Sequence, residues 1–212
     1  MAESKQITHL SKKLCAGVLV ATICLCLLAG CARSEPEPAY DVLFYGDSIT
    51  AGGNFGDYFP DLKVVNLGIN GATLEDLTEW VPRVSANRPG KIFVMAGSNN
   101  LDYTNVDQCV ELFRGLLDAL HKACPYAELF VESMLPMDKA IATASNCPIR
   151  VIKEYNGRLQ ALAEEYGIPY LDIFPAYEYH GGLNSKLTED GIHLKDDAFG
   201  PWAEIVRPYL EP

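Results

Sequence analysis

From residue 40 onward, short continuous apolar runs alternate with longer stretches in which apolar residues recur at helical spacing. The runs predict strands and the longer stretches predict helices. Strands are expected at residues 41–45, 63–67, 91–96, 127–133 and 169–173, and helices near 73–86, 106–123, 149–166 and 198–209. Because strand and helix alternate, we expect a five-stranded parallel sheet covered by helices on both faces, a three-layer α/β/α sandwich.

The first thirty residues follow a different pattern. Lys5, Lys12 and Lys13 precede an apolar run from Leu14 to Leu28. A basic segment followed by a short apolar core is typical of an export signal. The run has about 15 residues, fewer than the roughly 20 that a membrane-spanning helix needs. We therefore interpret residues 1–30 as a signal peptide.

The end of this leader carries a candidate lipidation site. Leu28-Ala29-Gly30-Cys31 resembles the bacterial lipobox, which implies that Cys31 is lipidated and becomes the mature N-terminus. Residues 31–39, polar and proline-rich, would then form a flexible tether. The protein is expected to be exported and anchored to a bacterial membrane, on its periplasmic or extracellular face. The alternatives are an ordinary signal peptide and an uncleaved anchor.

Residues 40–212 are enough for one domain with a sizeable core. The chain has a formal charge of −11, and its leader carries three lysines and one glutamate, so the remainder carries −13. Such an acidic surface repels nucleic acid and anionic membranes, so we expect neither as a partner. It also favours a neutral substrate. Few histidines and no Cys/His cluster at ligand spacing occur after the leader, so we expect no metal and no cofactor.

Three cysteines follow the candidate lipidation site. Cys109 and Cys124 share one expected helix, about 22 Å apart at 1.5 Å per residue, which forbids a bridge between them. Cys109 and Cys147 could form a single disulfide near the edge of the sheet, and buried thiols are the alternative.

Candidate catalytic residues follow the ends of several expected strands. Carboxyl ends of parallel strands meet at one edge of a sheet, where open α/β folds bind ligands. The side chains and turns expected to converge there are Ser48, Gly71, Asn99, Asp190 and His193.

Ser48 lies in Gly46-Asp47-Ser48, directly after the first expected strand. A serine hydroxyl there can act as a nucleophile if a base removes its proton, and the N–H groups of the following helix favour developing negative charge. Ser48 could instead simply cap that helix. The chain has no Gly-x-Ser-x-Gly elbow and no Gly-x-Gly-x-x-Gly after this strand.

His193 is the best candidate for the base, because Asp190 precedes it by three residues on one loop. A carboxylate that holds the second ring nitrogen fixes the working tautomer of the imidazole. The alternative is a loop in which Asp190 only satisfies backbone N–H groups. Residues 66–71 and 97–100 could supply an oxyanion hole, through the backbone at Gly71 and the amide of Asn99, or could be plain turns.

The order Ser48, Gly71, Asn99, Asp190 and His193 resembles the SGNH, or GDSL-type, hydrolase family over nearly all of the mature domain. The resemblance implies a flavodoxin-like fold, with Ser48 as nucleophile, Asp190 and His193 completing a triad, and Ser48, Gly71 and Asn99 forming the oxyanion hole. Many family members carry Asp after the Gly-x-Asn block, where this chain has Asn100. That difference is expected to alter loop bonding rather than abolish activity.

The resemblance implies ester hydrolysis through an acyl-enzyme. A short-chain acetylesterase acting on O-acetylated carbohydrate is expected, because the chain is acidic and has an export signal. The alternatives are a lysophospholipase or thioesterase, and a lipid-anchored binding protein without catalysis. Tyr177, Tyr179 and His180, with residues 136–147, could line the acceptor side or form a surface loop.

Overall fold

The computed structural model describes residues 37–101, 104–145 and 147–210. Its main sheet has five parallel strands in the order β2-β1-β3-β4-β5. This is the flavodoxin-like order, which places a topological switch point beside β1. The strands are β1 (Tyr40–Gly46), β2 (Val64–Gly68), β3 (Pro89–Met95), β4 (Glu128–Glu132) and β5 (Tyr170–Leu171). The predicted parallel sheet is confirmed, with a fifth strand shorter than expected.

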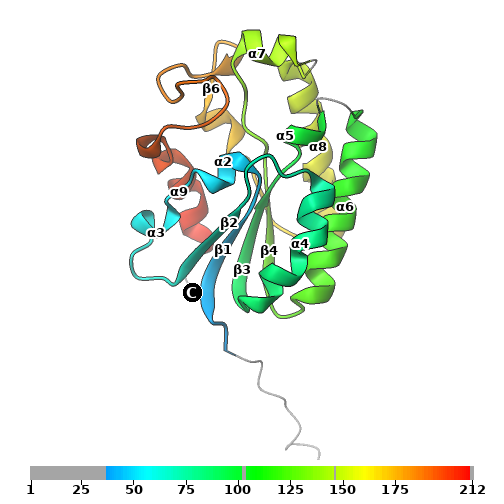
Figure 1. Ribbon diagram of the computed structural model, residues 1–212, viewed down its shortest axis with the longest axis vertical. Helices are drawn as coiled ribbons and strands as arrows, with labels where there is room; N and C mark the ends of the chain where they lie inside the picture. The colour runs from blue at the N-terminus through cyan, green and yellow to red at the C-terminus, as the bar shows by residue number, and fades with distance from the viewer. Residues whose placement is uncertain (1–36, 102–103, 146, 211–212) are drawn as a thin grey trace, which may run out of the picture. The chain divides into compact units, whose positions relative to one another are not determined.

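Helices cover both faces of the sheet, as the alternating pattern predicted (Figure 1). One face is covered by α4 (Leu74–Ala86), α6 (Val106–Ala123) and α8 (Ile149–Tyr166). The other is covered by α3 (Phe55–Tyr58) and α9 (Gly200–Val206). The fold is therefore a three-layer α/β/α sandwich.

Local sequence explains where the long helices begin and end. Thr73 caps α4 in a capping box with Asp76, each side chain bonding the other residue's backbone N–H. Asn105 caps α6 by accepting from the backbone of Gln108. The α8 helix starts directly after Pro148 and ends at Gly167.

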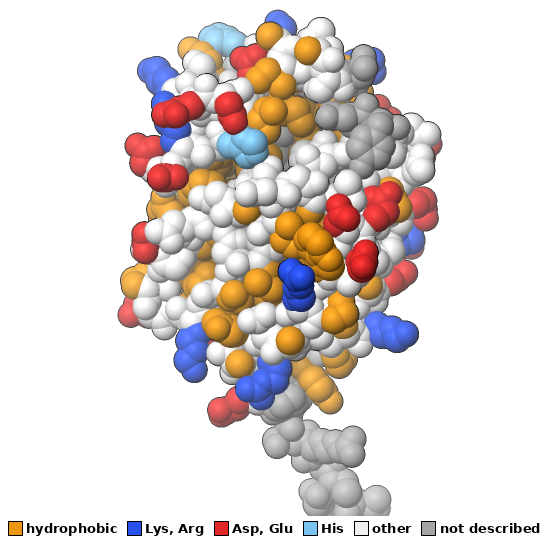
Figure 2. All heavy atoms as spheres, viewed as in Figure 1, with side chains coloured by type: hydrophobic (Ala, Val, Ile, Leu, Met, Phe, Trp, Pro, Cys, Tyr) orange, Lys and Arg blue, Asp and Glu red, His pale blue; other side chains and the backbone are white. Residues whose placement is uncertain are grey.

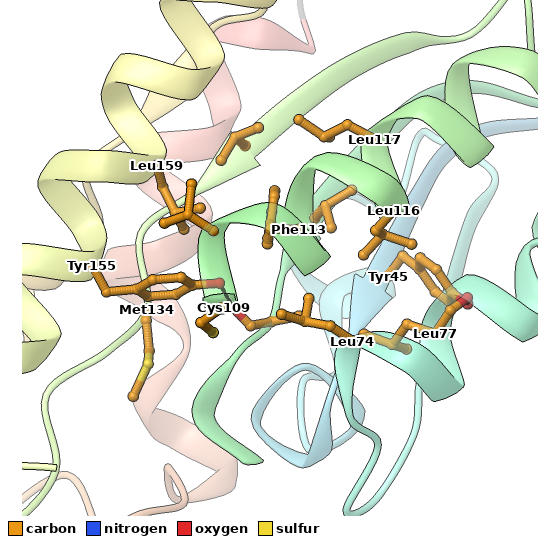
Figure 3. Close-up of a cluster of buried hydrophobic side chains, with 14 of the residues drawn as sticks. Tyr45, Leu74, Leu77, Cys109, Phe113, Leu116, Leu117, Met134, Tyr155 and Leu159 are labelled. Carbon is orange, nitrogen blue, oxygen red and sulfur yellow. Dashed lines mark hydrogen bonds between the residues drawn. The ribbon is translucent and has the colours of Figure 1, made fainter. Parts of the chain in front are cut away.

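The larger core lies between the sheet and the three long helices. Figure 3 shows aliphatic and aromatic side chains from α4, α6 and α8 meeting over β1, with Tyr155 entering from α8 and Tyr45 from β1. Each of these tyrosines satisfies its hydroxyl by donating to a backbone carbonyl, Tyr45 to Leu77 and Tyr155 to Ala96. The second of these bonds anchors α8 to the carboxyl end of β3.

The opposite core combines aliphatic side chains with a group of contacting aromatic rings, and we call it the aromatic core. The rings of Phe44, Phe93 and Phe130 stack across three neighbouring strands, with centroids 5.3 and 4.4 Å apart. Phe55 of α3 stacks on Phe44 and meets Trp202 of α9 edge-on. This side of the sheet thus holds the two short helices that border the turn after β1.

Several short elements were not predicted. They are α2 (Ser48–Ala51), the α3 helix already described, α5 (Ser98–Leu101), α7 (Lys139–Ala144) and a two-stranded hairpin of β6 (Glu178–Tyr179) and β7 (Gly182–Leu183). Elements of two to six residues are too short to show a hydrophobic period. The predicted closing helix is also shorter, because Arg207–Tyr209 forms a 3-10 turn that contains Pro208.

Cys109, Cys124 and Cys147 are all buried thiols, the second of the two alternatives for the cysteines. Burial raises the pKa of the Cys109 thiol to about 12, which leaves it protonated and unreactive at neutral pH. These cysteines therefore pack as core residues.

The predicted signal peptide, Cys31 and residues 32–36 of the tether lie outside the described residues. Within the part of the chain that the structure describes, none of the helices is both long enough and apolar enough to span a bilayer.

Glu132, at the end of β4, is a buried carboxyl in the aromatic core. One of its oxygens accepts from Trp202 Nε1 at 2.5 Å, while Oε2 has no hydrogen-bond partner among the described residues. Burial raises the pKa of this carboxyl to about 8, and the bond from Trp202 only partly opposes the shift. Glu132 is therefore protonated in the folded protein at neutral pH.

Replacing Glu132 with Gln is expected to change how stability depends on pH. An unfolded Glu loses its proton near about pH 4.3, so between that pH and about 8 the folded state binds one more proton than the unfolded state. The Glu132 contribution is complete below the unfolded pKa and is lost as pH rises, by about 1.4 kcal/mol per pH unit. Urea denaturation from pH 5 to 9 should show the free energy of unfolding of Glu132→Gln rising relative to that of wild type, by about 1.4 kcal/mol per pH unit up to pH 8. Exposed Glu128→Gln on the same strand is the control, and parallel pH curves for Glu132→Gln and wild type would contradict the assignment.

Candidate active site

The turn after β1 presents Ser48 at the carboxyl edge of the sheet. Gly46 ends the strand so close to its neighbour that a Cβ there would lie 2.1 Å from the carbonyl oxygen of Met95. Asp47 then caps α2, its carboxylate accepting from the backbone N–H of Ile49. Ser48 is the first residue of that helix, so capping is the role of Asp47 and the Ser48 hydroxyl is left available.

The loop from Thr188 to His193 holds the second half of the site. Asp190 Oδ1 accepts from the backbone N–H groups of Ile192 at 2.9 Å and His193 at 2.8 Å. Its other oxygen, Oδ2, lies 2.6 Å from His193 Nδ1. Asp190 thus fixes its own loop through one oxygen and orients the imidazole through the other.

A continuous hydrogen-bonded chain joins this loop to the turn after β1. His193 Nε2 lies 2.9 Å from Ser48 Oγ, across 145 positions of sequence. The bond from the His193 ring, followed by that from the Ile192 backbone, holds the pKa of Asp190 well below its usual range. Asp190 is therefore ionised and faces the nitrogen that becomes positively charged when His193 accepts a proton.

The predicted oxyanion residues lie on the same hollow as Ser48. A cavity of about 630 Å³ is lined by Ser48, Ile49, Ala51, Gly52, Asn70, Gly71, Asn99, His193, Leu194 and Phe199. Gly71 has a φ of +72°, in the left-handed region that favours glycine. Of the predicted residues, only Asp190 is outside this lining, because it lies behind His193 in an adjoining cavity.

Asn99 is held in place by the loop that carries Gly71. Its side-chain Nδ2 donates to the carbonyl oxygen of Ala72 at 2.9 Å. A primary amide has two N–H groups, so the second remains available to a ligand. This arrangement lets Asn99 donate to a negatively charged oxygen in the cavity.

Asn100 stands where many SGNH members carry Asp, and here it bonds in two directions. Its Oδ1 accepts from the backbone N–H of Leu74 at 2.9 Å, and its Nδ2 donates to Glu75 Oε2 at 2.8 Å. An aspartate could make the first contact but would face the Glu75 carboxylate in the second. The amide at position 100 is thus matched to the acid at position 75.

Asn66 is a positioning residue that the sequence interpretation did not single out. Its Nδ2 donates to the carbonyl oxygens of Thr50 and Gly53, both at 2.7 Å, and its Oδ1 accepts from Gly68. These bonds fasten the end of α2 to β2. The sequence signal that could have indicated this role is the place of Asn66 at the start of residues 66–71, the stretch that ends with Gly71.

The suggestion that Tyr177 lines the acceptor side is wrong. Tyr177 is fully buried, and its hydroxyl donates to Ala198 and accepts from the backbone of Trp202. A tyrosine in a Gly-rich stretch looked like a loop residue, but its ring packs in the aromatic core. Tyr179 is exposed and its ring lies edge-on to His180.

Acidic side chains surround the outer side of His193. The cavity that adjoins Asp190 and His193 is also lined by Glu189, Asp196 and Asp197, with Lys195 as the one basic residue. On the face drawn in Figure 2, acidic side chains gather beside a histidine near α2. In the described part of the chain, no group of three or more His, Cys, Asp or Glu residues could hold a metal ion.

Comparison with known proteins identifies the family of the chain. Residues 44–198 match the GDSL-like Lipase/Acylhydrolase family, so the chain belongs to that family of ester hydrolases. A search of curated proteins found no match.

Solved structures share the fold at low identity. A GDSL-like lipase from Bacteroides thetaiotaomicron is 21% identical, with a TM-score of 0.69 over 84% of this chain and 92% of that one. The lipase/acylhydrolase from Enterococcus faecalis is 20% identical, with a TM-score of 0.68 over 80% and 94%. An acetyl-xylooligosaccharide esterase from Geobacillus is 20% identical, with a TM-score of 0.62 over 84% and 97%. These similarities concern the fold.

Replacing Asn100 with Asp tests its match to Glu75. The variant puts two carboxylates in contact and is expected to lose about 1–3 kcal/mol of stability at pH 8, with a smaller loss at pH 5 where protonation relieves the repulsion. Adding Glu75→Gln should recover the loss, because the new amide at position 75 donates to the carboxylate introduced at position 100. Adding Glu79→Gln, on the same helix, should not. Urea denaturation measures all four proteins, and equal recovery by both second changes would refute the pairing.

Proposed function

We propose that this protein is a serine esterase that works through an acyl-enzyme. The observation that carries the proposal is the continuous chain from Asp190 through His193 to Ser48, with contacts of 2.6 and 2.9 Å. A hydroxyl, an imidazole and an ionised carboxylate in this order form the arrangement that activates a serine nucleophile.

In the first half of the proposed reaction, Ser48 Oγ attacks the ester carbonyl carbon while His193 Nε2 takes the hydroxyl proton. Asp190 stabilises the resulting imidazolium through Nδ1. The tetrahedral intermediate collapses when His193 protonates the leaving alcohol, which departs and leaves an acyl group on Ser48. Water then attacks the acyl-enzyme while His193 takes one of its protons. The second tetrahedral intermediate collapses, the bond to Ser48 Oγ breaks as His193 returns that proton to it, and the carboxylic acid leaves.

The oxyanion hole of this mechanism consists of the backbone N–H groups of Ser48 and Gly71 and the side chain of Asn99. All three residues line the cavity that contains the Ser48 hydroxyl. The bond to Ala72 holds the Asn99 amide before substrate arrives. Donors fixed in advance stabilise developing charge without reorganising, which is the main source of their catalytic effect.

For the substrate, we propose a short acyl group, most simply acetyl, on a neutral carbohydrate. The acidic residues next to His193 disfavour anionic alcohols on that side. Fold similarity to the Geobacillus acetyl-xylooligosaccharide esterase supports the same substrate class. The export signal and the lipidation of Cys31 remain part of this proposal, because they would place the enzyme where exported glycans occur.

The alternative is a lysophospholipase or thioesterase that accepts a longer acyl chain. Ile49, Leu194 and Phe199 favour it, because they give the cavity an apolar part that could contact methylene groups. The cavity is also lined by Asn70, a polar side chain that does not suit a dedicated acyl channel. We therefore place this activity second.

Ser48→Ala is expected to lower kcat for p-nitrophenyl acetate by at least about 10⁴-fold, because it removes the nucleophile. Asn99→Ala should cost about 10²–10³-fold. A fluorophosphonate probe should label wild type and Asn99→Ala stoichiometrically and leave Ser48→Ala unlabelled. Ser145→Ala, at the C-cap of α7, is the control and should react fully. If the probe labelled no residue of the wild-type protein, the proposed catalysis would be refuted and a binding role favoured.

A series of p-nitrophenyl esters from C2 to C16 is expected to give its highest kcat/KM at C2–C4. In a second series, acetyl esters of neutral alcohols should give a higher kcat/KM than acetyl esters of phosphorylated alcohols. The double variant Asp196→Asn, Asp197→Asn should reduce this difference in kcat/KM. Release of acetate from acetylated xylo-oligosaccharide measures the proposed reaction directly. A maximum at C12 or above would favour the lysophospholipase or thioesterase.

A further inference from the structure

Two buried side chains below the catalytic serine have no part in the proposed proton transfers. Asp47 is 1% exposed and Ser98 is 7% exposed, although they lie 51 positions apart. The Ser98 hydroxyl donates a short hydrogen bond to Asp47 Oδ2, while Asp47 Oδ1 accepts from Ile49. This carboxylate therefore joins the turn after β1 to the turn after β3.

Hydrogen-bond donors from both turns favour the charged form of the buried Asp47 carboxyl. Burial raises the pKa of Asp47, and the Ser98 hydroxyl, followed by the Ile49 backbone, opposes that shift. Removing one donor from a buried carboxylate leaves a lone pair without a partner, which drives the group to move or to protonate. The two turns are thus joined through Asp47, which both the hydroxyl and the backbone of Ser98 favour in its charged form.

Each turn carries a proposed catalytic group directly beside this contact. Ser48 follows Asp47, and Asn99 follows Ser98. Beyond Asn99 the same loop bonds the third turn, through Asn99 to Ala72 and through Asn100 to Leu74. The three turns after β1, β2 and β3 therefore form one hydrogen-bonded frame. Within it, the Asp47–Ser98 contact directly joins the turn of the nucleophile to the turn of Asn99, while Asn66 joins α2 to β2.

We propose that Asp47 and Ser98 act as a positioning pair that holds the loop carrying Asn99 in register with Ser48. This inference rests on the proposed esterase function. Ser98 is a positioning residue rather than a catalytic one, because it acts through Asn99 and lies beneath the cavity surface. Since an error of about 1 Å in placing a catalytic group can cost about 10²-fold, loss of the pair should appear in kcat.

Ser98→Ala is expected to lower kcat for p-nitrophenyl acetate by about 10- to 100-fold and to change KM by less than about threefold. The matched control is Ser133→Ala. Ser133 is fully buried at the end of β4, where its hydroxyl accepts from the backbone of Phe174. Its loss should lower stability comparably while leaving kcat per labelled site within about threefold of wild type. Ser98→Cys keeps the side-chain volume with a weak donor and should show the same kcat loss if Ser98→Ala does not fold.

A double-mutant cycle with Asn99→Ala tests the route of the effect. If Ser98 acts by placing Asn99, Ser98→Ala should cost no more than about threefold when Asn99 is already absent. An undiminished loss in that background, or equal kcat values for Ser98→Ala and Ser133→Ala, would overturn the inference. Wild type that neither hydrolyses the ester nor reacts with the fluorophosphonate would instead refute the proposed function, so the two failures are distinguishable.

Discussion

The site depends on three neighbouring parallel strands ending at the same level. Gly46, the last residue of β1, pairs with Gly68 of β2 on one side and Met95 of β3 on the other. The chain therefore leaves all three strands together, and three turns begin side by side at one edge. Gly46 permits this arrangement, since any side chain there would collide with the neighbouring strand. Residues far apart in sequence consequently meet in one hollow.

These turns are buried and polar at once, which restricts the residues they can contain. Three of their polar side chains are buried, those of Asp47, Ser98 and Asn100. Each forms a hydrogen bond to another turn or to the backbone of its own turn. A buried polar group without such partners would destabilise the fold, so the bonds select one geometry rather than a set of similar ones. The hydrogen bonds that offset the cost of burying these polar groups also hold the turns in one arrangement. Glu132, with one oxygen unpartnered among the described residues, shows the opposite case and is kept neutral instead.

The sequence was sufficient to predict the sheet, its long helices and the convergence of Ser48 with His193. Those predictions rest on hydrophobic period and on the rule that parallel strands share an edge, both of which are local or topological. The Asp47–Ser98 contact could not be predicted, because pairing between side chains 51 positions apart depends on register and rotamer. Tyr177 was misplaced for a similar reason, since its Gly-rich stretch of sequence looks like a loop, whereas in space it is fully buried against Ala198 and Trp202. The match of Asn100 to Glu75 also required three-dimensional structure.

The loop that carries His193 is held less tightly than the buried turns after β1, β2 and β3. About half of the His193 and Asp190 side-chain surfaces is exposed, at 46% and 54%. Their loop is held by the antiparallel bridge between Thr188 and Leu194 and by a backbone hydrogen bond from Asp138 to Gly191. Exposed segments of this kind open far below the free energy of global unfolding. On warming, the loop that carries His193 is therefore expected to open at a lower temperature than the sheet and both cores. Heat inactivation would then occur at a lower temperature than unfolding and be reversed by cooling, because the turn that holds Ser48 is buried and the loop that holds His193 is exposed.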